Sequence, residues 1–308
     1  MIRTLLFLAL FPLSLALQAQ KKVAITIDDV PNTGIFQASG SLSPLLEMLD
    51  SLNIPVAVFI NEGLIYKTDA LPGNFSLLND WVSKPRVTAG NHTFGHLRAS
   101  EVSMEAFSRD VLKGEAITRE LTSLHGKALD FFRFPYNDLG ADSLQHNAVK
   151  GFLENEGYRI APFTIESSDW MFNNLYQHYL EQQNPGDAAR IKHAFIDYTL
   201  EMFTHFEQLS QERFQRPINH IFLCHDNALM AASLPVLLEN LQTRGYSLIS
   251  LEEAMADEAY LSEEHYYGRW GFSWIYRWME DPAKRKSLMQ QEPSMMDVYH
   301  EHEALNKK

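Results

Sequence analysis

Short apolar segments alternate with helical stretches along most of the chain, and this alternation limits the possible folds more than any other feature. Seven candidate strands, each bounded by turn residues, lie at 22–28, 55–60, 86–89, 129–133, 159–165, 219–224 and 246–249. Helical periodicity fills the stretches between them, which indicates a mostly parallel sheet covered by helices. Seven such units in about 230 residues predict an α/β fold, a distorted barrel.

Helix start and stop signals agree with this division. Ser43 followed by Pro44 predicts an N-cap and a first helical turn. A second helix is expected to begin near Ser103 and to end at Gly126.

Two segments depart from the simple repeat, and both are helical in pattern. Residues 171–217 are longer than a connection between a strand and a helix needs, so they predict two packed helices. The tail after Asp257 carries Trp270, Trp274 and Trp278 at helical spacing, which predicts a helix with one apolar stripe packed on the barrel. Neither segment is set apart by a linker rich in proline, glycine or serine. We therefore expect both to elaborate one domain.

The first residues have the pattern of an export signal. Arg3 precedes an apolar run that extends from Thr4 to Leu17, and Ala19 follows as a small residue at a cleavage point. The run is shorter than the roughly 20 residues that a membrane-spanning helix needs. The pattern predicts a cleaved signal at residues 1–19, a periplasmic or extracellular location, and no stable membrane insertion. Cys224 is the single cysteine, so no internal disulfide is possible.

The charge of the chain limits its partners. Its formal net charge is -13 at pH 7. Such an acidic chain is not expected to bind nucleic acid or an anionic membrane, because both are polyanions. Neutral or cationic partners are compatible with it, and the sequence does not determine an oligomeric state.

Two pairs of chemically active residues follow predicted strands. Asp28 and Asp29 end the first strand, and His92 and His96 follow the third, four residues apart. Taken singly, the aspartates are typical of a turn and the histidines of a surface. Taken together, two imidazoles on one face of a helical turn and one carboxylate would leave coordination positions open, as catalytic zinc sites require. These ligands suit zinc, cobalt or a similar divalent ion.

Further polar and aromatic residues also stand where strands end. Arg133 and Tyr136 follow the fourth strand, Asp169 and Trp170 follow the fifth, and His225 follows the sixth. The carboxyl ends of parallel barrel strands surround a single mouth, where active sites are found. Residues about 200 positions apart can therefore converge there.

Five sequence blocks, in this order, resemble the five motifs of the polysaccharide deacetylase (NodB-homology) family. They are residues 26–29, 92–96, 133–136, 169–170 and 223–225, and the resemblance spans about residues 22–255. It implies a distorted (β/α)7 barrel as a catalytic domain over residues 20–256. The insertion at 171–217 would belong to this domain, and residues 257–308 would form a helical extension packed on it.

The resemblance also implies roles for individual residues. Asp29, His92 and His96 would hold one divalent metal ion, zinc or alternatively cobalt. Asp28 would be the general base that takes a proton from water, and His225 would be the general acid. Amide hydrolysis needs this division, because water must be activated and the departing amine must receive a proton.

The remaining motif residues would support this chemistry. Arg133 would pair with the base, and Asp169 would orient the acid. The backbone N–H of Tyr136 would stabilise an oxyanion. Trp170 and Leu223 would form apolar walls for the acetyl methyl group.

The activity implied is hydrolytic deacetylation of an acetylated carbohydrate, with removal of N-acetyl groups from N-acetylglucosamine-containing oligo- or polysaccharides of chitooligosaccharide or peptidoglycan type as the first choice. An O-acetyl esterase acting on a xylan-like glycan would use the same residues. A non-catalytic glycan-binding protein would be expected to lack the base or the acid, and both are present. A two-metal phosphoesterase is disfavoured because no second cluster of ligands is evident.

Some features depart from the family pattern or fall outside it. Ile27 stands where phenylalanine is common, and Glu166 where the fourth motif often begins with aspartate. The insertion at 171–217, which many simple members lack, would restrict the substrate if it roofs the mouth. Cys224 should face away from its neighbour His225 and lie in the core rather than act as a nucleophile. The tryptophan stripe could alternatively stack on sugar rings.

Six further histidines lie on presumed helices or at a strand start and are expected to be structural or solvated. They are His125, His146, His178, His193, His205 and His220.

Overall fold

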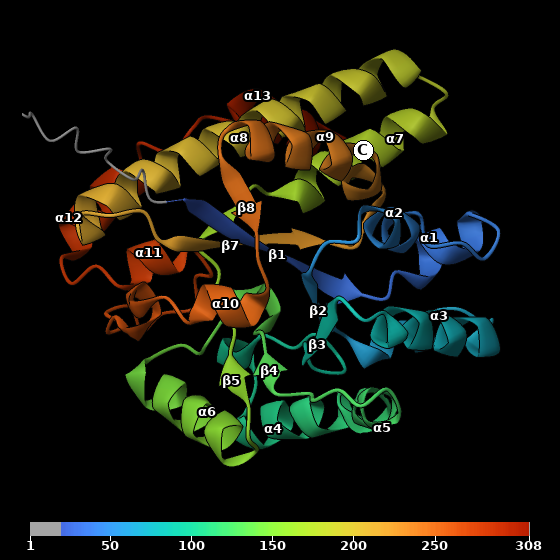
Figure 1. Cartoon of the computed structure of the whole chain (residues 1–308), viewed down its shortest axis with the longest axis horizontal. Coiled ribbons are helices and arrows are strands. Elements are labelled where there is room, and N and C mark those ends of the chain that lie inside the picture. Colours follow the sequence, from blue (N-terminus) through green and yellow to red (C-terminus); the bar gives the residue numbers. More distant parts are fainter. Residues whose placement is uncertain (1–19, 308) are drawn as a thin grey trace, which may run out of the picture.

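A computed structural model describes residues 20–307, and the predicted export signal lies outside these residues. Its strands are β1 (Lys21–Val30), β2 (Val56–Ile60), β3 (Val87–Asn91), β4 (Phe131–Phe132), β5 (Arg159–Ile160), β6 (Ile165–Glu166), β7 (Asn219–His225) and β8 (Tyr246–Leu248). All pair in parallel, in the order β5-β4-β3-β2-β1-β7-β6, and β8 pairs with the start of β1. The sheet curls into an incomplete barrel (Figure 1). The predicted fold class is confirmed.

The predicted fifth strand, 159–165, is wrong as a single strand. It is divided into β5 and β6, which stand at the two ends of the sheet order. Pro162 lies between them and has no N–H for a sheet ladder, which explains the interruption.

Helices surround the sheet, and α10 lies at the centre of the view (Figure 1). They are α1 (Thr33–Ala38), α2 (Pro44–Leu52), α3 (Leu71–Ser83), α4 (Met104–Lys113), α5 (Ala116–Leu124), α6 (Ser143–Asn155), α7 (Asp169–Glu181), α8 (Pro185–Phe214), α9 (Ala228–Thr243), α10 (Leu251–Met255), α11 (Trp274–Arg277), α12 (Pro282–Met289) and α13 (Met296–Asn306). Short 3-10 helices are η1 (Glu62–Tyr66), η2 (Ala99–Glu101), η3 (Pro135–Asn137) and η4 (Glu258–Leu261). Ser43 and Ser103 cap α2 and α4 as expected, but the predicted helix from Ser103 to Gly126 is broken at Gly114.

Two apolar clusters hold the layers together. Alternate residues of the strands point into the barrel, where Phe59, Phe131 and Phe163 form an inner cluster that residues of α10 join. The opposite faces of the same strands pack under the surrounding helices in a larger cluster. Burial on both faces explains why the strands read as continuous apolar runs.

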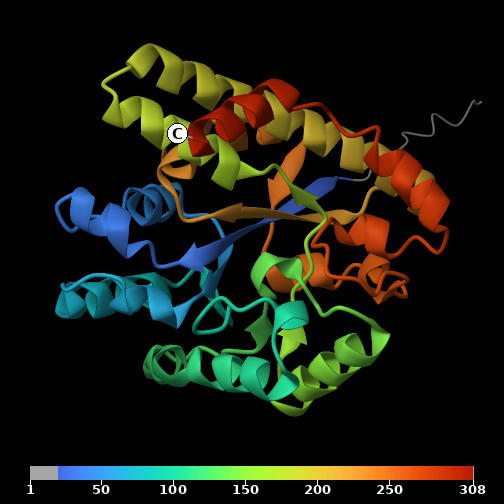
Figure 2. The ribbon, with the colours of Figure 1, turned by 180° about the vertical axis from the view of Figure 1, so that it is seen from behind.

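The region that was expected to hold two packed helices consists of α7 and α8, which pack on each other. The helix α13 of the tail lies against α7, as Figure 2 shows from behind. The fold therefore has both the helical insertion and the helical tail that the sequence predicted.

The single tryptophan-bearing helix predicted in the tail is wrong. Trp278 is 1% exposed at the end of α11 and Trp274 is half-buried at its start, but Trp270 lies in an irregular segment and is 61% exposed. Gly268 and Gly271 fall within the predicted helix, and glycine disfavours helical conformation.

No helix within residues 20–307 is both long enough and apolar enough to span a membrane.

Candidate metal and acid–base site

One carboxylate and two imidazoles converge at the carboxyl ends of β1 and β3. Asp29, His92 and His96 each offer a ligand atom, and these atoms lie within 4.8 Å of one another. Asp29 Oδ1 is 3.3 Å from His96 Nε2 and 3.7 Å from His92 Nε2. This donor set suits a divalent metal ion and leaves coordination positions for water and substrate.

The expectation that both histidines lie on one face of a helical turn is wrong. They lie in a loop, in which Thr93 has φ +65° and His96 has φ +56°. The side chain of Asn91 accepts the Thr93 N–H at 2.7 Å, and the Thr93 hydroxyl accepts the His96 N–H at 3.0 Å. These bonds compete with the helical pattern and fold the loop back on itself, so the imidazoles approach each other to 5.0 Å between ring centres.

Two glycines that the sequence analysis passed over determine where this loop lies. Gly63 donates to the Phe94 carbonyl at 3.1 Å, and a Cβ on Gly63 would stand 2.2 Å from that oxygen. A Cβ on Gly114 would stand 2.4 Å from the Thr93 carbonyl carbon. At the break between α4 and α5, the backbone of Gly114 therefore packs directly against the loop that carries His92 and His96. Asp110, on the same turn of α4, accepts the Gly95 N–H at 2.9 Å.

The tautomer of His92 is set by a backbone carbonyl. His92 Nδ1 lies 2.8 Å from the oxygen of Arg133, so Nδ1 carries the proton that is donated to it. This leaves Nε2 free to bind a metal and fixes the plane of the ring.

Asp28 and Asp29 both face His92, although adjacent strand residues normally point to opposite sides. Asp29 has φ +58°, and the pairing of β1 with β2 shifts between Ile27 and Val30. This irregularity turns Asp29 back, so that Asp28 Oδ2 and Asp29 Oδ1 lie 3.9 and 3.7 Å from His92 Nε2. The two carboxylates differ in access, since Asp28 is 2% exposed and Asp29 is partly open.

Asp28 is held from behind by a buried guanidinium. Arg133 Nη1 donates to Asp28 Oδ1 at 3.0 Å and to Thr26 Oγ1 at 2.6 Å, and Nη2 donates to the Pro162 carbonyl at 3.0 Å. Arg133 is fully buried and lies over the Phe59 ring. The predicted pairing of Arg133 with Asp28 is present in the structure, and it leaves the other Asp28 oxygen directed toward the histidines.

The proposed acid stands beside the proposed base. His225 and Asp28 are register partners on the neighbouring strands β7 and β1. His225 Nδ1 lies 2.7 Å from Asp169 Oδ1, and Asp169 Oδ2 accepts the His225 N–H at 2.9 Å and the side chain of Asn227 at 2.6 Å. Asn227 also caps α9.

Charge sets the protonation of these groups in different directions. Burial disfavours the charged form of His225, but the carboxylate of Asp169 outweighs it and raises the pKa to about 10. Burial, with the neighbouring His92, lowers the pKa of His96 to about 4. Burial acts to raise the pKa of Asp29, yet the nearby His96 and His92 lower it overall. These shifts favour a protonated His225, a neutral His96 and an ionised Asp29 at neutral pH.

The three predicted substrate contacts also lie near these groups in the chain or in space. Tyr136 is 48% exposed, has φ +57°, and its ring packs on His96 with centres 4.5 Å apart. Trp170 follows Asp169 and is 47% exposed. Leu223 is buried in the inner cluster on the same face of β7 as His225.

Two further side chains tie the strand ends together. Asp226 Oδ2 accepts the Asn32 N–H at 2.9 Å, which pins the chain just after Asp29. Glu166, where the family pattern often has aspartate, accepts the Ser168 N–H at 2.7 Å and so shapes the turn into α7. No periodicity in the sequence predicts these side-chain to backbone bonds.

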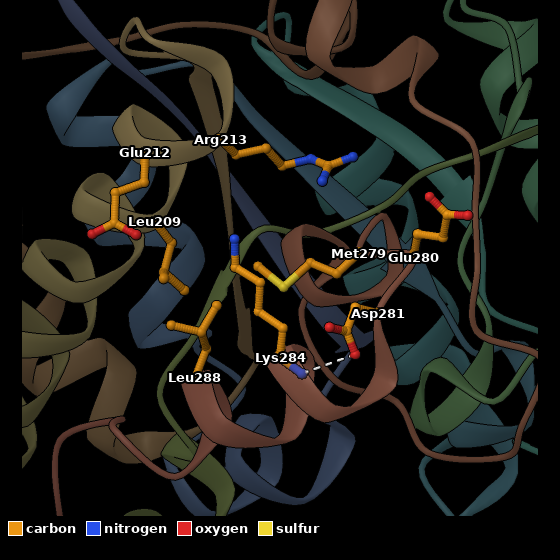
Figure 3. Close-up of a pocket in the computed structure, with 8 residues that line it drawn as sticks. All are labelled: Leu209, Glu212, Arg213, Met279, Glu280, Asp281, Lys284 and Leu288. Carbon is orange, nitrogen blue, oxygen red and sulfur yellow. Dashed lines mark hydrogen bonds between the residues drawn. The ribbon is translucent and has the colours of Figure 1, made fainter.

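Cys224 is fully buried, and its thiol contacts the Thr26 carbonyl on the outer side of the sheet. The six histidines that were expected to be structural or solvated are not part of the cluster of ligand atoms. A cavity of about 320 Å³ opens between α8 and α12 (Figure 3) and contains none of the site residues. Figure 1 places α12 near the start of β1, away from the strand ends that form the site.

A family model described as polysaccharide deacetylase matches residues 17–153. The fold resembles the solved Bc1960 peptidoglycan N-acetylglucosamine deacetylase, with a TM-score of 0.51 and 17% identity, over 77% of this chain and 88% of that one. The chain is similar to the polysaccharide deacetylase family over residues 17–153 and in its fold.

Two further proteins are similar to this chain. YheN of Bacillus subtilis (strain 168), described provisionally as a polysaccharide deacetylase, is 23% identical over 235 residues, which cover 76% of this chain and 68% of YheN. A mutant of BA3943 from Bacillus anthracis, a CE4 family pseudoenzyme with restored enzymatic activity, has a TM-score of 0.51 and 16% identity, over 77% of this chain and 68% of that chain. Sequence identities this low show a shared fold only. The activities and substrates in these descriptions are those of the similar proteins.

Proposed function

We propose that this chain is a polysaccharide deacetylase that hydrolyses acetyl groups from an acetylated carbohydrate with one divalent metal ion, zinc or cobalt, held by Asp29, His92 and His96. The favoured reaction is removal of N-acetyl groups from an N-acetylglucosamine-containing oligo- or polysaccharide. The observation that carries this proposal is the placement of Asp28 and His225 as register partners beside the three ligands.

Each proton transfer has a residue suited to it. Asp28 is unavailable as a ligand through Oδ1, which Arg133 occupies, so its other oxygen can accept a proton from water. His225 is kept protonated by Asp169 and can donate that proton to the departing nitrogen. A bound divalent ion would supply positive charge that acidifies water and polarises the acetyl carbonyl.

The other motif residues would orient the acetyl group. The backbone of Tyr136 would offer an N–H to the oxyanion, and its ring would pack against the ligand His96, as it does in this structure. Leu223 and Trp170 would bound the methyl group with apolar surface. We propose that residues 1–19 direct export, which would bring the enzyme to cell-wall or environmental glycans.

The test is acetate release by the purified protein loaded with zinc or cobalt. Chitooligosaccharides and acetylated xylan are assayed in parallel, each with and without a chelator. We expect chelator-sensitive release, faster from the chitooligosaccharides. Faster release from xylan would instead identify an O-acetyl esterase.

A non-catalytic role is the alternative from another class, because the similar fold of BA3943 belongs to a pseudoenzyme. A protein that holds one equivalent of metal, binds glycans and releases no acetate from any substrate would contradict the proposed hydrolysis. The presence of both Asp28 and His225 in bonded positions argues against this outcome.

A further inference from the structure

We propose that the tail loop of residues 264–272 adds a sugar-binding subsite to the mouth, with the exposed indole of Trp270 as its stacking platform. The inference rests on the proposed function, since it identifies an oligosaccharide, rather than an isolated acetylated sugar, as the ligand. It also assigns a role to the part of the chain that follows the barrel.

Exposed aromatic rings are concentrated around the candidate site. Tyr66 packs on Phe94, in the loop that carries His92 and His96, with ring centres 5.8 Å apart. Tyr136 packs on His96, and Trp170 follows Asp169. Tyr66, Tyr136 and Trp170 are 47–49% exposed. Trp270 is 61% exposed, more than any other aromatic side chain in the part of the chain described. Sugars stack on such rings because both present flat apolar faces with polar edges.

The tail loop touches the site directly. Gly271 lies so close to Tyr136 that an added Cβ would stand 1.9 Å from the Tyr136 carbonyl oxygen. Trp270 is the preceding residue, and Tyr136 in turn contacts His96. The indole is therefore one residue removed from the wall of the mouth, where a neighbouring unit of a bound glycan would lie.

A buried arginine holds the loop in this shape. Arg277 is fully buried, pairs with Glu264, and donates to the Trp270 carbonyl at 3.1 Å. The Tyr266 hydroxyl accepts the Trp270 N–H at 3.2 Å. Both backbone groups of Trp270 are thus satisfied within the loop, and its position does not depend on burial of the indole.

The side chain of Trp270 does not pack in the apolar core. Trp274 and Trp278 of the same segment pack against the larger apolar cluster, whereas Trp270 does not belong to either cluster. Arg269 lies over the indole at 4.9 Å from the ring centre, which adds hydrogen-bond donors beside the platform. An ordered loop that contacts Tyr136 through Gly271 and exposes the neighbouring indole and guanidinium is a surface suited to a sugar ring and its hydroxyl groups.

The experiment compares wild-type protein with Trp270→Ala and with Leu261→Ala, a matched control at an 85% exposed apolar residue of the same tail. Binding of N-acetylglucosamine oligomers is measured by calorimetry, and acetate release is measured on the same oligomers and on 4-nitrophenyl acetate. We expect Trp270→Ala to weaken oligomer binding and to raise KM about tenfold, with kcat unchanged. Turnover of 4-nitrophenyl acetate should stay at the wild-type rate, and Leu261→Ala should match wild type throughout.

Failure of the subsite and failure of the proposed function give different results. Equal affinity and KM in wild type and Trp270→Ala, or no binding of oligomers by wild type, would overturn the subsite even if acetate is released. Trp270-dependent binding without acetate release would support the subsite and contradict hydrolysis. A uniform loss of kcat on every substrate in Trp270→Ala, including 4-nitrophenyl acetate, would show a structural role instead and would also overturn it.

Discussion

The two sides of the mouth are built by different physical means. On the ligand side, the loop with His92 and His96 is fixed by backbone hydrogen bonds and by close contact with Gly63 and Gly114. On the acid side, His225 is fixed by contacts with the buried carboxylate of Asp169, which also governs its charge. Shape determines the first side, and charge determines the second.

This difference indicates which substitutions should disrupt each side. The ligand side should fail when a methyl group is added to a glycine far from the chemistry. The acid side should fail when a charge is removed without any change of shape. Each prediction below tests one part of this contrast.

The largest loss of activity is expected when a proposed metal ligand or a proposed proton carrier is removed. His92→Ala should lose both the metal and the activity, because it deletes a ligand. His225→Ala and Asp28→Asn should each lower kcat by about 10²–10⁴-fold while retaining one equivalent of metal, because they delete a proton carrier. Metal content and acetate release on the same preparations measure this. Full activity in Asp28→Asn would refute its assignment as the base.

Loss of charge alone on the acid side should shift the pH profile. Asp169→Asn keeps the shape and one oxygen that can accept the His225 Nδ1–H, but it removes the charge that raises the His225 pKa and replaces the oxygen that accepts the His225 N–H and the Asn227 side chain. An acid works only below its pKa, so the alkaline limb of kcat/KM, expected at or below pH 10, should move toward neutral pH, with a loss of about tenfold or more at pH 9. Asp142→Asn, which keeps a helix-capping oxygen, is the control. An unmoved limb would contradict the role of Asp169.

Loss of shape alone on the ligand side should weaken metal binding. Gly114→Ala would press a methyl group on the Thr93 backbone, so we expect about tenfold weaker metal binding and a loss of about 1–3 kcal/mol in the free energy of unfolding. Gly151→Ala, with no atom within 4 Å of the new methyl group, is the matched control and should be neutral or slightly stabilising. Competition against a chromogenic chelator measures the affinity. Equal metal affinity in the two variants would show that contact at Gly114 does not place the ligands.

The smallest effect is expected at Cys224, which belongs to neither side. Its thiol faces the outer cluster, so Cys224→Ala should retain activity within about twofold. Initial rates of acetate release at saturating substrate check this. A loss of more than tenfold in a folded variant would place the thiol in the reaction.

The sequence predicted the fold and the convergence of the motif residues for a physical reason. Parallel strands bury both faces, so their apolar runs are visible, and residues just after such runs must gather at one edge. This rule and the family resemblance together identified the motif residues, which are Asp28, His92, Arg133, Asp169 and His225.

The local geometry was not predictable from the same patterns. The left-handed conformations of Asp29 and His96 overrode the strand and helix periods that were expected at these positions. The clamps at Gly63 and Gly114 join segments that are neighbours only after folding. The spacing of the tryptophans in the tail matches the period of a helix. However, Gly271 lies against the Tyr136 backbone, and the helix α11 begins only at Trp274.

The most direct test of this account is a titration of metal-depleted protein with Co²⁺ while acetate release from a chitooligosaccharide is followed. Activity should start near zero, rise in proportion to added metal and stop rising at one equivalent. Full activity in the metal-free protein, or a rise that continues to two equivalents, would contradict a single metal ion held by Asp29, His92 and His96.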